Sequence, residues 1–87
     1  MNYTVFWPDA AQDQLADQYL AARRDGREAD FSQAVSEIEV KLARDPLTIG
    51  EQRVGSQRVL VDLPALVFYL VDDQARVVTV AGVRYVP

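Results

Sequence analysis

The spacing of apolar residues changes near residue 50, and this change constrains the fold more than any other feature of the sequence. Between a short aromatic segment at the start and residue 50, apolar residues recur every three or four positions, which is the period of a helix with one buried face. After residue 50 they alternate with polar residues or form short valine-rich runs, which is typical of strands. The sequence therefore predicts a helical segment followed by a group of strands.

The first helix is predicted directly after a short aromatic and β-branched strand, Tyr3–Trp7. Pro8 suits a helix entrance, and Asp9 followed by Gln12 is a capping-box pattern. The apolar face of this helix consists of Ala11, Leu15, Tyr19 and Ala22. Arginines at positions 23 and 24 suit the last turn, and Gly26 favours an ending there.

A second helix is predicted from about Asp30 to Arg44, because Asp45-Pro46 cannot continue it. Glu37 and Lys41 are spaced to form a favourable surface pair. The apolar face consists of Phe31, Ala34, Val35, Ile38 and Leu42. Since the connection at Gly26 is short, the two helices should form an antiparallel hairpin.

The strands of the second half are separated by turn residues. Residues 52–54 and 57–63 flank a turn at Gly55-Ser56, and Pro64 separates them from the next strand. Ala65–Val71 is almost continuously apolar, as expected for a central strand covered on both faces, and a last strand covers 76–85. We therefore expect one α+β domain over residues 1–87, with a helical hairpin packed on a small antiparallel sheet in the order β-α-α-β-β-β(-β).

Composition narrows the chemistry that the chain can perform. There is no Cys and no His, which excludes disulfides, thiolate sites and the commonest general base. The net charge is −4, which argues against a general nucleic-acid binder, but all of the excess lies before residue 51. No signal peptide or membrane span is recognised, so we expect a cytoplasmic protein that does not contact a membrane. The second half is neutral and rich in arginine, and is the candidate functional face.

Five residues of the second half form the candidate site: Glu51, Arg53, Arg58, Arg84 and Tyr85. Strand alternation places Arg58 with Leu60 and Asp62, and Arg84 with Val80 and Val78, whereas Tyr85 joins Val83 and Val77. Arg58 and Arg84 are then expected to meet on the sheet face away from the helices, with Arg53 nearby. Three guanidinium groups and a carboxylate could hold a phosphate and deprotonate a hydroxyl. The alternative is that these arginines are edge-strand charges that prevent aggregation.

A second group of charges lies on the first helix. Asp9, Asp13 and Asp17 are spaced to line one ridge, which can be interpreted as a metal site or as a solvated helix face. Three carboxylates on one straight helix rarely converge on an ion, so the solvated face is favoured. We expect neither a metal nor a cofactor.

Several segments together resemble the RelE/ParE superfamily, the toxins of type II toxin–antitoxin modules. They are the strand Tyr3–Trp7 with Pro8-Asp9, the helix end Leu42–Pro46, the segment Gly50-Glu51-Gln52-Arg53, and the strands at 58–60, 66–73 and 77–80. The resemblance covers nearly the whole chain and rests on this pattern rather than on one motif.

The resemblance implies a small toxin that a cognate antitoxin wraps and neutralises. Members similar to RelE cut mRNA on the ribosome, and members similar to ParE poison DNA gyrase. For a metal-independent endoribonuclease, the resemblance implies that Arg58 and Arg84 stabilise phosphorane charge, Glu51 is the base and Tyr85 the proton donor or a stacking platform, with Arg53 binding substrate. The lysines of RelE-like sites are absent, so a ParE-like toxin or a non-catalytic binding module is the alternative.

Overall fold

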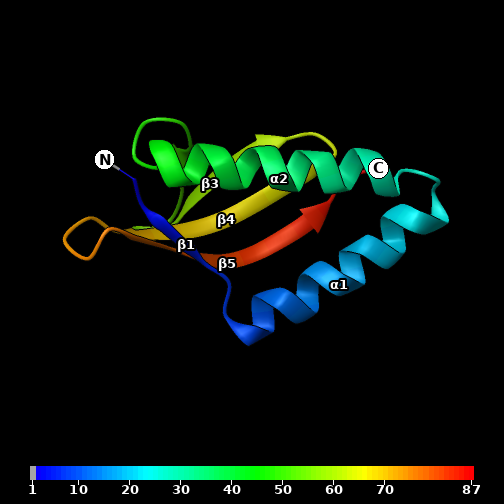
Figure 1. The fold of residues 1–87 in the computed structure, drawn as a ribbon, viewed down its shortest axis with the longest axis horizontal. Coiled ribbons are helices and arrows are strands. Elements are labelled where there is room, and N and C mark those ends of the chain that lie inside the picture. The colour runs from blue at the N-terminus through cyan, green and yellow to red at the C-terminus, as the bar shows by residue number, and fades with distance from the viewer. Residues whose placement is uncertain (1) are drawn as a thin grey trace.

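The computed structural model describes residues 2–87, which form two helices and five strands (Figure 1). In chain order, the elements are β1 (Thr4–Phe6), α1 (Asp9–Arg24), α2 (Glu28–Arg44), β2 (Glu51–Gln52), β3 (Arg58–Asp62), β4 (Ala65–Asp72) and β5 (Val77–Tyr85). This order is the predicted one and confirms an α+β fold with a helical hairpin.

The five strands form one sheet in the order β1-β5-β4-β3-β2. Neighbouring strands from β2 to β5 pair in antiparallel fashion, whereas β1 pairs with β5 in parallel, with Val5 opposite Val78. The sheet is therefore mixed, and the prediction of an antiparallel sheet is wrong at β1. Side-chain alternation is the same in parallel and antiparallel strands, so the sequence pattern does not reveal the direction of pairing.

The core lies between the helices and one face of the sheet. Directly opposed residues on paired strands share a face, and the pairs that face the helices include Val67 with Val83 and Tyr69 with Val80. These four side chains are almost completely buried. From the helices, α2 contributes five buried side chains (Phe31, Ala34, Val35, Ile38 and Leu42), whereas α1 contributes only Ala11 and Ala22. The helix α2 therefore supplies most of the buried helical side chains of the core.

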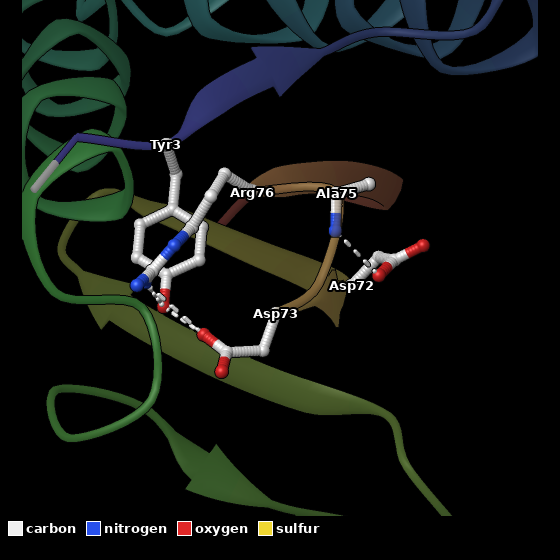
Figure 2. A network of polar contacts seen from close by, with 5 residues as sticks. All are labelled: Tyr3, Asp72, Asp73, Ala75 and Arg76. Atoms are coloured by element: carbon white, nitrogen blue, oxygen red, sulfur yellow. Dashed lines mark hydrogen bonds and ion pairs between the residues drawn. The ribbon is translucent and has the colours of Figure 1, made fainter.

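The first strand is held at its beginning by a polar network from the β4–β5 turn (Figure 2). The Tyr3 hydroxyl donates to the Asp73 carboxylate, and Arg76 donates to Tyr3 Oη at 2.7 Å and to Asp73 Oδ1 at 3.2 Å. The Arg76 guanidinium also lies 5.0 Å from the centroid of the Tyr3 ring. A backbone hydrogen bond also joins these two segments, because Thr4 N–H donates to Arg76 O at 2.9 Å. This network aligns β1 with the start of β5.

The ends of the helices differ in detail from the predictions. Pro8 is the N-cap of α1 and no side chain caps that end, so the predicted capping box is absent. The Gln12 amide instead donates to Trp7 O at 2.9 Å, because Asp9 already lies inside the helix. The helix α2 begins at Glu28, two residues before the predicted start.

A surface pair on α2 also differs from its prediction. Lys41 does not pair with Glu37 but reaches across to β3, where its Nζ lies 3.5 Å from Asp62 Oδ2. Glu37 accepts a hydrogen bond from Gln33 at 3.2 Å instead. The sequence gives no signal for the Lys41–Asp62 pair, because the two residues are brought together only when α2 packs beside β3.

Candidate functional site

Arg58 faces the helices and is used to hold a loop. It lies opposite Tyr69 on β4, and its guanidinium donates to Leu47 O at 2.8 Å and to Gly50 O at 2.7 Å. The Tyr69 hydroxyl donates to Pro46 O at 2.8 Å in the same loop. A Cβ atom on Gly50 would lie 2.1 Å from Tyr69 Oη, so only glycine allows this close approach. Arg58 therefore anchors the segment between α2 and β2.

Arg84 lies on the opposite face of the sheet. It is directly opposed to Leu66, which in turn opposes Val61, and none of these three faces the helices. The Arg84 side chain is exposed, and it forms no ion pair or side-chain hydrogen bond with any of residues 2–87. The prediction that Arg58 and Arg84 meet on one face is therefore wrong.

Tyr85 is a core residue on the side of the helices. Its ring packs edge-to-face on Phe31 with 5.7 Å between centroids, and its hydroxyl donates to Asp25 Oδ2 at 2.7 Å. Burial is the main cause that raises the pKa of Tyr85 above its ordinary value, and the hydrogen bond to Asp25 acts in the same direction. A buried hydroxyl that is already donating to a carboxylate is poorly placed to protonate a substrate.

A β-bulge in β5 explains why the predicted neighbours of Tyr85 and Arg84 are partly wrong. Phe68 opposes Gly82 but Tyr69 opposes Val80, so Ala81 is an extra residue without a partner. Before the bulge, the residues of β5 that face the helices are Val78 and Val80, and after it they are Val83 and Tyr85. A prediction from strict alternation assigns the residues on one side of an inserted residue to the wrong face.

Glu51 and Arg53 lie at the far edge of the sheet. Glu51 opposes Val59 on the side of the sheet that carries Arg84, and Arg53 is in the turn that follows β2, where its backbone N–H donates to Gln57 O at 2.7 Å. Both side chains are exposed. Glu51 is three strands away from β5, which separates its backbone from that of β5 by about 14 Å at the usual spacing between strands. Glu51 and Arg84 therefore share a face but do not converge on one phosphate-sized site.

The face that carries Arg84 has an apolar centre, and we call it the open face. Its apolar residues are Phe6, Val59, Val61, Leu66, Phe68 and Leu70. It also carries Glu51, Thr79 and Arg84, and none of these residues belongs to the core that packs against the helices. Phe6 is 52% exposed, Val61 50% and Leu70 39%. An antiparallel sheet with one face in water normally alternates apolar and polar residues. Here β4 is apolar on both faces, although no element formed by residues 2–87 covers the second one.

The apolar character of β4 is the signal by which the sequence could have revealed the open face. Its continuous apolar run predicts a strand covered on both faces, but residues 2–87 cover only one of them. Val59 is the exception on the open face, because it is only 2% exposed; it lies opposite Glu51 on β2 and Phe68 on β4. A cavity of about 190 Å³, lined in part by Ile49, Glu51 and Val61, adjoins this edge.

The two helices carry neither a metal-binding cluster nor a membrane span. Asp9, Asp13 and Asp17 are exposed on α1, and residues 2–87 contain no group of three or more carboxylates placed to hold a metal ion. Neither α1 nor α2 is long and apolar enough to cross a membrane.

The chain was compared with protein families, curated proteins and solved structures, and matches occur only among the solved structures. No protein-family model matches the chain, and no match is found among curated proteins. Among solved structures, the chain is similar to one chain of the toxin–antitoxin complex RelBE2 from Mycobacterium tuberculosis, with a TM-score of 0.72 and 23% sequence identity. The match covers 98% of this chain and 99% of that chain. The predicted RelE/ParE-like fold is thereby confirmed.

Proposed function

We propose that this chain is the toxin component of a type II toxin–antitoxin pair and that a cognate antitoxin neutralises it. Its fold is shared over 98% of its length with a chain of a toxin–antitoxin complex. The observation on the molecule itself that supports this proposal is the open face, where Phe6, Val61 and Leu70 remain exposed. Contiguous exposed apolar surface on a small protein is typical of a site where another protein binds.

The same geometry favours a toxin that acts by binding a protein over a nuclease. Of the four residues expected to be catalytic, Arg58 holds a loop and Tyr85 is packed in the core. Arg84 and Glu51 remain on the surface, but three strands apart. A general base and the donors that stabilise a phosphorane must lie within a few ångströms of one phosphate. Among the targets that the resemblance implies, DNA gyrase therefore fits the geometry better than mRNA.

Expression of the chain in bacteria, with and without the product of the neighbouring reading frame, tests the toxin proposal. Growth arrest that the second protein relieves is expected. Loss of DNA supercoiling during the arrest, with intact mRNA, supports the gyrase target. mRNA cleavage that Arg84→Ala abolishes would instead establish a nuclease, and absence of any arrest would leave only a binding role.

The open face can be tested with two matched leucines. Leu70 is 39% exposed on β4, and Leu20 is 52% exposed on α1. If the antitoxin buries Leu70, Leu70→Gln should weaken its binding by about 10- to 100-fold, as expected for one lost apolar side chain. Leu20→Gln should leave the affinity unchanged, with isothermal titration calorimetry as the measurement. Equal effects of the two variants would place the antitoxin elsewhere.

A further inference from the structure

The outer edge of β5 is covered by two different elements in succession. The strand β1 pairs with β5 only from Val77 to Thr79. Beyond that point α1 lies along β5, as Figure 1 shows, and two of its glutamines take over the hydrogen bonding. Gln14 Oε1 accepts from Val83 N–H at 2.8 Å, and Gln18 Oε1 accepts from Tyr85 N–H at 2.7 Å.

The spacing of the two glutamines matches that of the two strand amides. Residues four apart on a helix rise by about 6 Å along its axis, and residues two apart on a strand are separated by about 6.7 Å. Gln14 and Gln18 therefore occupy one side of α1 in step with the outward N–H groups of Val83 and Tyr85. An uncovered strand edge is a template for pairing with another strand, so this arrangement blocks pairing at that edge.

The helix α1 buries fewer and smaller side chains than α2 does. Its completely or nearly completely buried side chains are two alanines, while Leu15 and Tyr19 are only half-buried. Its contacts with α2 include the edge-to-face packing of Tyr19 on Phe31 and a hydrogen bond from the Tyr19 hydroxyl to Ser32 Oγ at 3.0 Å. Because apolar burial supplies most of the stability of a helix in a protein, less of it holds α1 in place than holds α2.

Both ends of α1 are suited to act as joints. Gly26 follows it with a φ of +70°, and Pro8 precedes it without any side-chain cap. We propose that α1 is a releasable cover of the β5 edge, which opens as a unit about Pro8 and Gly26 while α2 and the sheet stay folded. Opening removes Gln14 and Gln18 from β5, breaks the hydrogen bond from the Tyr85 hydroxyl to Asp25 at the end of α1, and leaves two adjacent strand N–H groups available to another strand. This inference does not depend on the proposed toxin function.

Native-state hydrogen exchange measured by NMR tests this opening. In the unmodified chain, the amides in the middle of α1 and those of Val83 and Tyr85 should share one opening equilibrium. That opening should need less free energy than the opening that exposes the amides of the central strand β4. Exchange of all of these amides only through global unfolding would overturn the proposal.

Substitution of the glutamines separates opening of α1 from a local effect. Gln14→Ala and Gln18→Ala should each increase the opening constant about fivefold, and together about 25-fold, from the usual net worth of a hydrogen bond. Gln14→Glu with Gln18→Glu retains an acceptor at each position and should restore the protection. Gln33→Ala on the exposed side of α2 is the matched control and should change nothing. Faster exchange confined to Val83 and Tyr85, with α1 unchanged, would contradict opening as a unit.

The single tryptophan provides a second measurement. Trp7 lies beside the Pro8 joint, and its Nε1 is buried without a hydrogen-bond partner among residues 2–87. If opening about Pro8 also loosens the packing of Trp7 on the core, acrylamide should quench Trp7 fluorescence more strongly in the double alanine variant than in the unmodified chain. Equal quenching, in a variant that circular dichroism shows to be folded, would count against the hinge at Pro8.

Discussion

The two faces of the sheet carry similar apolar residues but differ in how far those residues are buried. On the side of the helices, Val67, Tyr69 and Val83 have no exposed surface. On the open face, Val61 and Leu70 are 50% and 39% exposed. The difference arises from what lies over them, since α1 and α2 both pack on the same side. One face therefore folds the chain, and the other remains available to a partner.

Arg58 and Arg84 show the same difference between the two faces, because they have the same side chain but lie on opposite sides of the sheet. Arg58 is half-buried and donates to two backbone carbonyls, so it contributes to the fold. Arg84 is exposed beside Leu66 and contributes a positive charge next to the apolar centre of the open face. The position of an arginine relative to the covered face thus decides whether its loss affects stability or binding.

The largest expected effect comes from removing a phenylalanine from the covered face. Phe31 is completely buried on α2, and Phe6 is 52% exposed on β1. Phe31→Ala should lower the free energy of unfolding by about 3–5 kcal/mol, because it leaves a cavity in the core. Phe6→Ala should lower it by less than about 1 kcal/mol. Urea denaturation of both variants measures the difference, and similar losses would mean that the open face also contributes to folding.

An intermediate effect is expected from the two arginines. Arg58→Ala removes the donor for the carbonyls of Leu47 and Gly50 and should cost about 1–3 kcal/mol. Arg84→Ala should stay within about 0.5 kcal/mol, as for an exposed residue without a partner. Urea denaturation again provides the measurement. If Arg84→Ala destabilised the chain as much as Arg58→Ala, the contrast between the two faces would not hold.

The smallest expected effect is a loss of stability at high pH, caused by ionisation of Tyr3 just before β1. The hydrogen bond to Asp73, followed by burial, raises the pKa of Tyr3 above its ordinary value of 10.0, although Arg76 acts against this shift. Folding therefore favours the neutral phenol. The stabilisation is complete below pH 10 and is lost as the pH rises through the higher pKa of the folded state.

Unfolding curves of the unmodified chain and of Tyr3→Phe between pH 8 and pH 11 test whether ionisation of Tyr3 lowers the stability. The free energy of unfolding should fall more steeply with pH in the unmodified chain. Part of the slope should persist in Tyr3→Phe, because the pKa of Tyr85 is raised in the same direction. Parallel curves would show that Tyr3 titrates alike in the folded and unfolded chains.

The elements of the fold could be predicted from the sequence because their periodicity is strong. The apolar stripe from Phe31 to Leu42 has the spacing of a helix with one buried face, and the structure buries the residues predicted. The positions of β3 and β4 also followed, from the turn at Gly55-Ser56 and the break at Pro64, but β2 is Glu51–Gln52 and not the predicted 52–54. Pairing direction did not follow, because β1 would show the same alternation in either orientation.

The candidate site was predicted less well than the fold, for reasons that lie in β3 and β5. In β3, Val59, Leu60 and Val61 are all apolar, so the alternation does not tell which face turns toward the helices, and Arg58 was assigned to the wrong one. In β5, the bulge at Ala81 changes the phase between Val80 and Val83. The contact of Tyr85 with Asp25 joins residues 60 positions apart, and only the packed helical hairpin brings them together.

The parallel pairing of β1 with β5 has a consequence for how the chain folds during synthesis. Thr4 pairs with Val77, and β5 also pairs with β4 and packs against both helices. The strand on which all of these elements depend is therefore made after them, and β1 has no partner until β5 leaves the ribosome. Contacts between such distant residues close large loops and slow folding. A ribosome-bound chain that has not yet released β5 should thus lack both the covered core and the completed open face.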